Sequence, residues 1–158
     1  MQFTKFLTTF ALIASTTASF TPNTECRPLL GNAVLDCGLP SDLLHISKVS
    51  ITPQVPVRGQ KITVTLTGEL SDEIPDGTTA HVIAKNGDVT VIDKSYNFCT
   101  VVGSGQNKCP IKKGPVTTTK EIEIPAGLPD GSYIIDGTIN TPAKKQVAHI
   151  QLKVTFKS

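Results

Sequence analysis

Hydrophobic and polar residues alternate along most of the chain beyond residue 45. In the clearest run, Ile62, Val64 and Leu66 alternate with lysine and threonine, a period of two that puts the apolar side chains on one face of a β-strand. The Asn86-Gly87 pair is a strong hairpin signal and is predicted to join two such strands. The pattern predicts about seven strands separated by turn residues, over residues 46–52, 61–67, 80–85, 89–98, 116–124, 133–139 and 150–156.

Helical periodicity is not persuasive anywhere in this region, although residues 42–45 could form a single turn. Branched aliphatic residues and threonine dominate, and tryptophan is absent, which favours strands. Many short antiparallel strands are typical of a sandwich or a barrel. Because the strands have one polar face, two sheets packed face to face fit the pattern best. We therefore predict an all-β fold, an antiparallel sandwich.

The inward-facing residues of such a sandwich allow two interpretations. They could simply fill a core, or the sheets could be splayed and enclose a pocket for an apolar ligand. The small size of the inward residues Ala80, Ala84 and Gly137 weakly favours the cavity interpretation, as does the shortage of large aromatic side chains. Composition alone leaves both interpretations open.

The N-terminus has the features of a secretory signal peptide over residues 1–19. Lys5 supplies a positive charge, and the apolar residues 6–14 are followed by small residues that a signal peptidase could cut after Ala18 or Ser19. The alternative is a membrane anchor, but the apolar run is about half of the ~20 residues that a spanning helix needs. We predict cleavage, and a soluble mature protein that is secreted or held in a vacuolar or lysosomal lumen.

Four cysteines in an oxidising compartment imply disulfide bonds. They allow three pairings, and proximity in sequence favours Cys26–Cys37 with Cys99–Cys109, because short loops are the easiest to close. A metal site is the rival interpretation. Neither pair has the close spacing of a zinc knuckle, and the three histidines are distant in sequence, so we expect no metal.

Charge and motif content argue against several functional classes. The formal net charge is +2, with both signs scattered along the chain, so nucleic-acid binding has no support. None of His45, His81 and His149 lies in a recognisable catalytic setting, and residues 103–105 (Gly-Ser-Gly) lack the spacing of a nucleophile elbow. His81 and His149 fall on the polar phase of their strands, where solvated imidazoles are expected. The sequence predicts neither an enzyme nor a bound cofactor.

Several motifs around the second cysteine pair are informative together. Residues 97–99 (NFC) precede a polar loop that ends in residues 109–114 (CPIKKG). Other motifs lie at residues 46–53 (ISKVSITP), 56–64 (PVRGQKITV), 68–71 (GELS), 124–125 (IP), 128–133 (LPDGSY) and 152–156 (LKVTF). Over about residues 45–157 the chain resembles the MD-2-related lipid-recognition (ML) domain. Within that family it looks most like the fungal phosphatidylglycerol/phosphatidylinositol transfer proteins, relatives of the Niemann-Pick C2 type.

The resemblance implies an immunoglobulin-like β-sandwich that holds a lipid between its sheets, here over residues 45–158 after a disulfide-stapled lead-in of residues 20–44. It implies that Cys99 and Cys109 form the hairpin disulfide of the family, and that Phe98 lies beside the mouth of the pocket. The other cavity residues are assigned by strand phase alone. The predicted lipid-binding set is Val64, Leu66, Val82, Phe98, Ile111, Ile122, Tyr133, Ile135, Ile139, Ile150, Leu152 and Val154.

One feature departs from the family. Its members often carry a cysteine in the last strand that bonds to one near the N-terminus, but residues 147–152 (VAHIQL) contain none. Cys26 is therefore expected to pair locally with Cys37, and the N-terminal region to be less firmly tied to the sandwich than in relatives.

The leading hypothesis is a monomeric protein that extracts a phospholipid (phosphatidylglycerol or phosphatidylinositol) or a sterol and transfers it between membranes. It would contact the membrane surface transiently, through residues 100–108 with Lys112 and Lys113, whose charges favour anionic headgroups. An immunoglobulin-like structural or adhesive module with a filled core is one alternative. A lipid-presenting accessory to a receptor or hydrolase is another.

Overall fold

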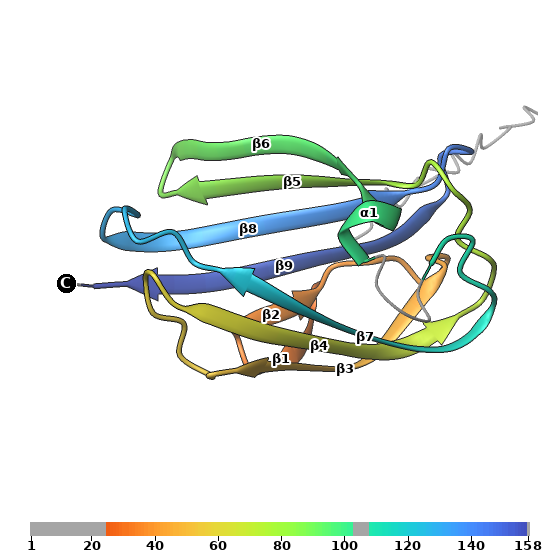
Figure 1. Cartoon of the computed structure of the whole chain (residues 1–158), viewed down its shortest axis with the longest axis horizontal. Helices are drawn as coiled ribbons and strands as arrows, with labels where there is room; N and C mark the ends of the chain where they lie inside the picture. The colour runs from red at the N-terminus through yellow and green to blue at the C-terminus, as the bar shows by residue number, and fades with distance from the viewer. Residues whose placement is uncertain (1–24, 103–107, 158) are drawn as a thin grey trace, which may run out of the picture.

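Two antiparallel sheets make up the protein in a computed structural model that describes residues 25–102 and 108–157 (Figure 1). The larger sheet has six strands, in the order β1 (Arg27–Leu30), β2 (Val34–Asp36), β9 (Gln146–Phe156), β8 (Gly131–Asn140), β5 (Thr79–Asn86) and β6 (Val89–Asn97). The smaller sheet has three, in the order β3 (Leu44–Thr52), β4 (Lys61–Leu70) and β7 (Gly114–Glu123). The predicted all-β, immunoglobulin-like sandwich is confirmed.

Strand register explains how the alternating sequence produces two apolar inner faces. In the smaller sheet Ile62 lies opposite Ile122, and Leu66 lies opposite Thr118. In the larger sheet Ile135 is flanked by Ala84 and Leu152. Residues directly opposite each other in a sheet share a face, so these side chains point towards the other sheet. The predicted hairpin is also present, with Asn86 opposite Val89 across a two-residue turn.

The described residues contain nine strands, compared with the predicted seven or so. The additional strands, β1 and β2, come from the range predicted as a lead-in, and they are only four and three residues long. β2 pairs with β9, and the backbone N–H of Cys37 donates to the carbonyl oxygen of His149 at 2.8 Å. Backbone hydrogen bonds therefore attach this segment to the last strand, where no cysteine is available.

A short helix, α1 (Phe98–Val102), follows β6 where a continuing strand and a loop were expected. The side-chain oxygen of Asn97 accepts a hydrogen bond from the backbone N–H of Thr100 at 3.1 Å, which is the geometry of an N-cap. The helical turn considered for residues 42–45 is absent, because Leu44 and His45 already pair with β4. The signal peptide predicted for residues 1–19 lies outside the described residues.

The fully buried core lies towards one side of the sandwich. The larger sheet approaches the smaller one where β1 and β9 face β3. Ile46 of β3, only 2% exposed, is packed there with buried side chains from β2, β4 and the start of β9. The core cluster consists of Val34, Leu43, Leu44, Ile46, Val49, Ile51, Ile62, Leu70, Ile74, Ile111, Val147 and Ala148.

No helix in the described part of the chain is long and apolar enough to cross a membrane.

The core can be tested with one buried and one exposed isoleucine. Replacing Ile46 with alanine is expected to lower the free energy of unfolding by about 3 kcal/mol, because it removes a packed side chain and leaves a cavity. The matched change at Ile134, which is 41% exposed on the outer face, should cost less than about 1 kcal/mol. Urea denaturation measures both values. Equal losses would contradict the placement of the core.

The two disulfides, Cys26–Cys37 and Cys99–Cys109, are both present as predicted. Replacing Cys99 and Cys109 together with serine should lower the free energy of unfolding by about 3 kcal/mol, the chain-entropy value for a loop of this size. The Cys26 and Cys37 double replacement is the matched comparison. Its loop is of nearly equal length, so the same chain-entropy value applies to its loss of stability. An undiminished stability of the Cys99/Cys109 variant in urea would show that this link contributes nothing to the fold.

Candidate functional site

The inner faces of the two sheets are partly exposed where they border the core cluster. Several inward aliphatic side chains keep partial solvent access, and seven of them lie on β4, β5, β8 and β9, although positions between packed sheets are normally buried. We call this surface the open inner face. It consists of Val64, Leu66, Val82, Ile135, Ile139, Ile150 and Leu152.

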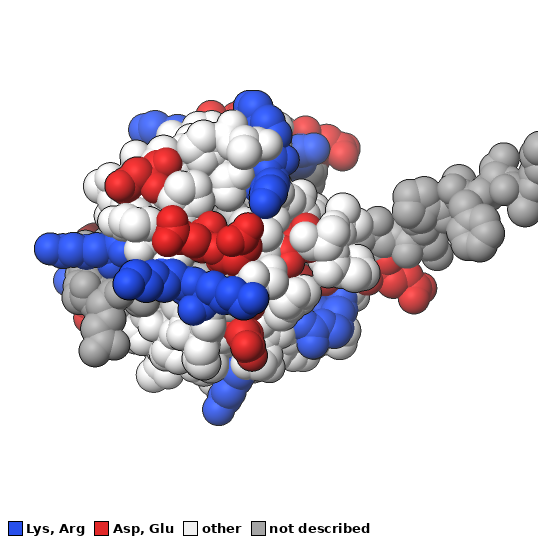
Figure 2. Space-filling view, turned by 90° about the vertical axis from the view of Figure 1, so that its right-hand side faces the viewer, with Lys and Arg blue, Asp and Glu red and all other residues white. Residues whose placement is uncertain are grey.

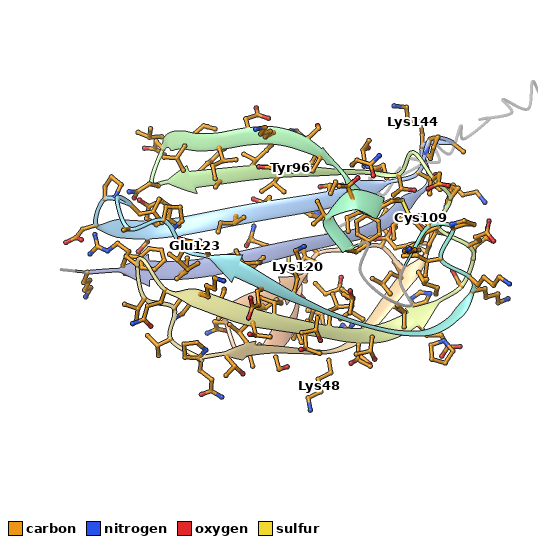
Figure 3. The ribbon with its side chains drawn as sticks, viewed as in Figure 1. Lys48, Tyr96, Cys109, Lys120, Glu123 and Lys144 are labelled. Carbon is orange, nitrogen blue, oxygen red and sulfur yellow. A yellow bond between two sulfur atoms is a disulfide. The ribbon has the colours of Figure 1, made fainter. Side chains whose placement is uncertain are left out.

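The open inner face leads to the side of the sandwich formed by β6 and β7. Among the described residues these strands are edges of different sheets, and no β-ladder joins them. Their inward positions stay accessible: Ile92 is 42% exposed, Tyr96 38% and Ile122 44%. Figure 3 shows Tyr96 and Lys120 on the two sides of the space between the sheets. We call this side the β6–β7 opening.

Helix α1 lies at one end of the opening, in contact with β5, β6 and β7. Its residues Phe98 and Val102 line an apolar pocket of about 30 Å³, which has room for about one water molecule. The other lining residues are Leu44, Leu66, Leu70, Ile74, Ile111, Val116 and Thr118.

Two links hold α1 and the segment after it in place. The Cys99–Cys109 disulfide joins the helix to the residues before β7. Ile74 and Ile111 exchange backbone hydrogen bonds of 2.9 Å, which tie that segment to the connection between β4 and β5. The predicted mouth residue Phe98 is therefore held by local covalent and backbone links.

The twelve residues predicted to bind lipid all lie on inward-facing positions or in this apolar pocket. Seven make up the open inner face, Phe98 and Ile111 line the pocket, and Ile122 lies at the β6–β7 opening. Tyr133 and Val154 lie opposite each other towards the far end of the larger sheet, where the Tyr133 hydroxyl donates to the carbonyl oxygen of Pro129 at 2.9 Å. Their contact with lipid stays a prediction.

Sequence reasoning missed several residues of the site. Ile92 and Tyr96 share one phase of residues 89–98, so the alternation could have included them. Val102 lies on a helix that the pattern did not indicate, and Ile74 pairs outside the named strands. No periodicity could have assigned these last two.

Contacts between histidine and aspartate side chains lie on the outer faces of the sandwich. His81 lies 2.7 Å from a carboxylate oxygen of Asp93, and His149 lies 3.3 Å from one of Asp136. Both imidazoles lie on outer faces, where they were expected, although His149 is half-buried. The Asp76 carboxylate is near the sulfur atoms of Cys99 and Cys109, but sulfurs in a disulfide are not thiolate ligands.

The end of the sandwich that carries the β4–β5 and β8–β9 loops bears both signs of charge, interspersed (Figure 2). There Lys145 lies 3.3 Å from Asp72. The pKa of the Asp72 carboxyl is lowered, first by a hydrogen bond from the backbone N–H of Glu73 and then by Lys145. Lys112 and Lys113 are exposed in this region, whereas residues 103–107 of the predicted membrane-contacting loop lie outside the described residues.

A larger hollow, of about 910 Å³, lies beside β1 and the start of β3. Its lining includes an Arg27–Asp36 ion pair at 2.9 Å and the buried carboxylate of Asp42, which accepts a hydrogen bond from Gln146. Charged walls are unsuited to an acyl chain, because hydrocarbon there would displace water from polar groups. The open inner face is therefore the better candidate for an apolar ligand.

Comparison with known proteins gives a family match. The family model described as the ML domain matches residues 31–156. A phosphatidylglycerol/phosphatidylinositol transfer protein of Candida albicans is 30% identical over 132 residues, which cover 82% of this chain and 69% of the relative. A putative phosphatidylglycerol/phosphatidylinositol transfer protein 2 of Dictyostelium discoideum is 32% identical over 126 residues, covering 80% and 87%.

Solved structures agree on the fold. A Niemann-Pick type C2 protein from Japanese carpenter ant superposes with a TM-score of 0.61 at 18% identity, over 77% of this chain and 97% of that one. Chicken MD-1 complexed with lipid IVa gives a TM-score of 0.54 at 18% identity, over 72% and 83%. The resemblance noted in the sequence is confirmed: the chain belongs to the ML domain family.

Proposed function

We propose that this protein binds a phospholipid or a sterol between its two sheets and transfers it between membranes. The observation that carries the proposal is the partial exposure of seven inward aliphatic side chains on the open inner face. Phosphatidylglycerol and phosphatidylinositol are the first candidates, because relatives that are 30% and 32% identical over the aligned residues are named as transfer proteins or putative transfer proteins for them.

The free energies involved suit a carrier. Moving a sixteen-carbon chain from water onto an apolar surface is worth roughly 13 kcal/mol, at about 0.8 kcal/mol per methylene. A bilayer offers nearly the same amount, so exchange between protein and membrane is close to balanced. The protein then acts by shielding the chain from water during the transfer, and it needs no catalytic group.

The ligand enters through the β6–β7 opening. The apolar pocket of about 30 Å³ beside α1 is too small for an acyl chain, so the chain lies along the open inner face. Occupation widens the separation of β6 from β7. No ladder has to break for this movement, because the two edges are unpaired, while the buried core around β3 keeps the sheets together on the opposite side.

The domain organisation and the compartment form part of the proposal. Residues 1–19 serve as a cleaved signal peptide, residues 20–44 form the N-terminal segment, and residues 45–158 form the lipid-binding sandwich. Two disulfides are typical of proteins in an oxidising compartment. The mature protein is a monomer that is secreted or resides in a vacuolar or lysosomal lumen, and it contacts membranes transiently.

The partly exposed inner face argues against a structural module with a filled core, because such a core would bury these residues. A lipid-presenting accessory remains the second candidate, since it would use the same apolar surface. Stable co-purification with a receptor or a hydrolase, together with failure to move lipid between vesicles, would favour the accessory.

Lipid extraction and transfer test the proposal directly. Organic extracts of the purified protein are expected to contain phospholipid or sterol at a reproducible ratio to protein, as measured by mass spectrometry. The protein should also speed the movement of a fluorescent phospholipid from donor to acceptor vesicles. Lipid-free protein that moves no phospholipid would refute the transfer function.

Two adjacent isoleucines provide a matched mutational test. Ile135→Asp places a carboxylate on the open inner face and is expected to abolish lipid uptake, because burying an ion beside an acyl chain costs several kcal/mol. Ile134→Asp introduces the same charge one residue away on the outer face and should leave uptake unchanged. Unchanged uptake in a folded Ile135→Asp protein, with its circular dichroism preserved, would refute the assigned strand phase.

A further inference from the structure

Two lysines lie on the inward phase of the edge strands that face each other across the β6–β7 opening. On β6, Lys94 is directly opposite Val82, a residue of the open inner face. On β7, Lys120 is directly opposite Val64, another residue of that face. Since opposite residues share a face, both lysine side chains leave the backbone on the side of the aliphatic surface.

The surroundings of both lysines combine apolar surface with open solvent. The Lys94 ammonium lies 5.7 Å from the centre of the Tyr96 ring, in a cation–π arrangement. Ile122 follows Lys120 on the same phase of β7 and is 44% exposed. Lysine stems can cover such aliphatic surface while the ammonium stays in water. Each lysine therefore places a charge where the apolar surface meets solvent.

Neither lysine forms an ion pair with any residue in the two described ranges, 25–102 and 108–157. The nearest carboxylates in sequence occupy the opposite phase and have partners of their own. Asp93 contacts His81 at 2.7 Å on the outer face, and Glu121 lies 3.7 Å from Lys61 on the outer face. The inward lysines are thus available to an external anion.

We propose that Lys94 and Lys120 select a lipid with a net negative phosphate headgroup, whose acyl chains lie along the open inner face. This inference rests on the proposed transfer function and extends it to headgroup choice. A phosphodiester accepts charge-assisted hydrogen bonds from ammonium groups. Phosphatidylglycerol offers this anion alone, whereas phosphatidylcholine adds a quaternary cation that the same two lysines repel.

The test compares transfer of two fluorescent lipids with identical acyl chains, phosphatidylglycerol and phosphatidylcholine, from the same donor vesicles. Wild-type protein is expected to move phosphatidylglycerol faster. The K94Q/K120Q variant should lose about tenfold of this preference, as two partly exposed charge pairs would contribute, and still move phosphatidylcholine. In the wild type the preference should fall as salt is raised.

A matched control removes the same charge elsewhere. Lys48 on β3 points away from the space between the sheets (Figure 3), and Lys153 lies on the exposed phase of β9. The K48Q/K153Q variant has the same net charge as K94Q/K120Q and should keep the wild-type preference. A loss of preference in this control as well would assign selectivity to overall charge and overturn the proposal.

Other outcomes separate the inference from the function on which it rests. If K94Q/K120Q keeps the wild-type preference for phosphatidylglycerol, the lysines do not select the headgroup, although transfer itself stands. If the wild type moves neither lipid and carries none, the transfer function fails and the inference fails with it. Millimolar glycerol phosphate, a headgroup without chains, should leave transfer unchanged; strong inhibition would indicate a free-phosphate site instead.

Discussion

Packing of β3 against the larger sheet is the interaction on which the rest of the structure depends. In the described part of the chain no hydrogen-bonded ladder joins the two sheets, so apolar burial does most to hold them together, beside single links such as the 2.7 Å hydrogen bond from the Arg27 side chain to the Ile46 carbonyl oxygen. That burial is concentrated around Ile46, Val49 and Val147, on the side where β3 faces β1 and β9. At roughly 1.5–3 kcal/mol per buried aliphatic side chain, this side closes the sandwich without help from the opposite edges.

The open β6–β7 side of the sandwich is a consequence of this one-sided core. With the sheets fixed along β3, β6 and β7 remain unpaired edges, and α1 with its disulfide closes only one end between them. A folded domain gains nothing from leaving inward aliphatic side chains in contact with water. A ligand that covers the open inner face accounts for this arrangement, whereas a filled core leaves it unexplained.

The sequence predicted strand phase well and spatial arrangement poorly, for physical reasons. Strict alternation in β4, β8 and β9 assigned Leu66, Ile135 and Leu152 to inner faces, because side-chain direction in a strand is a local property. β1 and β2 are too short to show a period. How far Ile135 stays exposed depends on which strands face it across the sandwich, and no local pattern contains that information.

Lysines at inward positions bear on whether the β6–β7 side could close as a dry core. Burying an unpaired ammonium costs several kcal/mol, so a sequence specifying a filled sandwich would keep lysine off the inner phase. Lys94 and Lys120 break that rule on both facing edges, while Val82 and Val64 beside them obey it. An aliphatic inner face bordered by two lysines is complementary to a lipid that has hydrocarbon chains and an anionic headgroup. The two positions that oppose closure of the sandwich therefore support the proposed anionic lipid as its ligand.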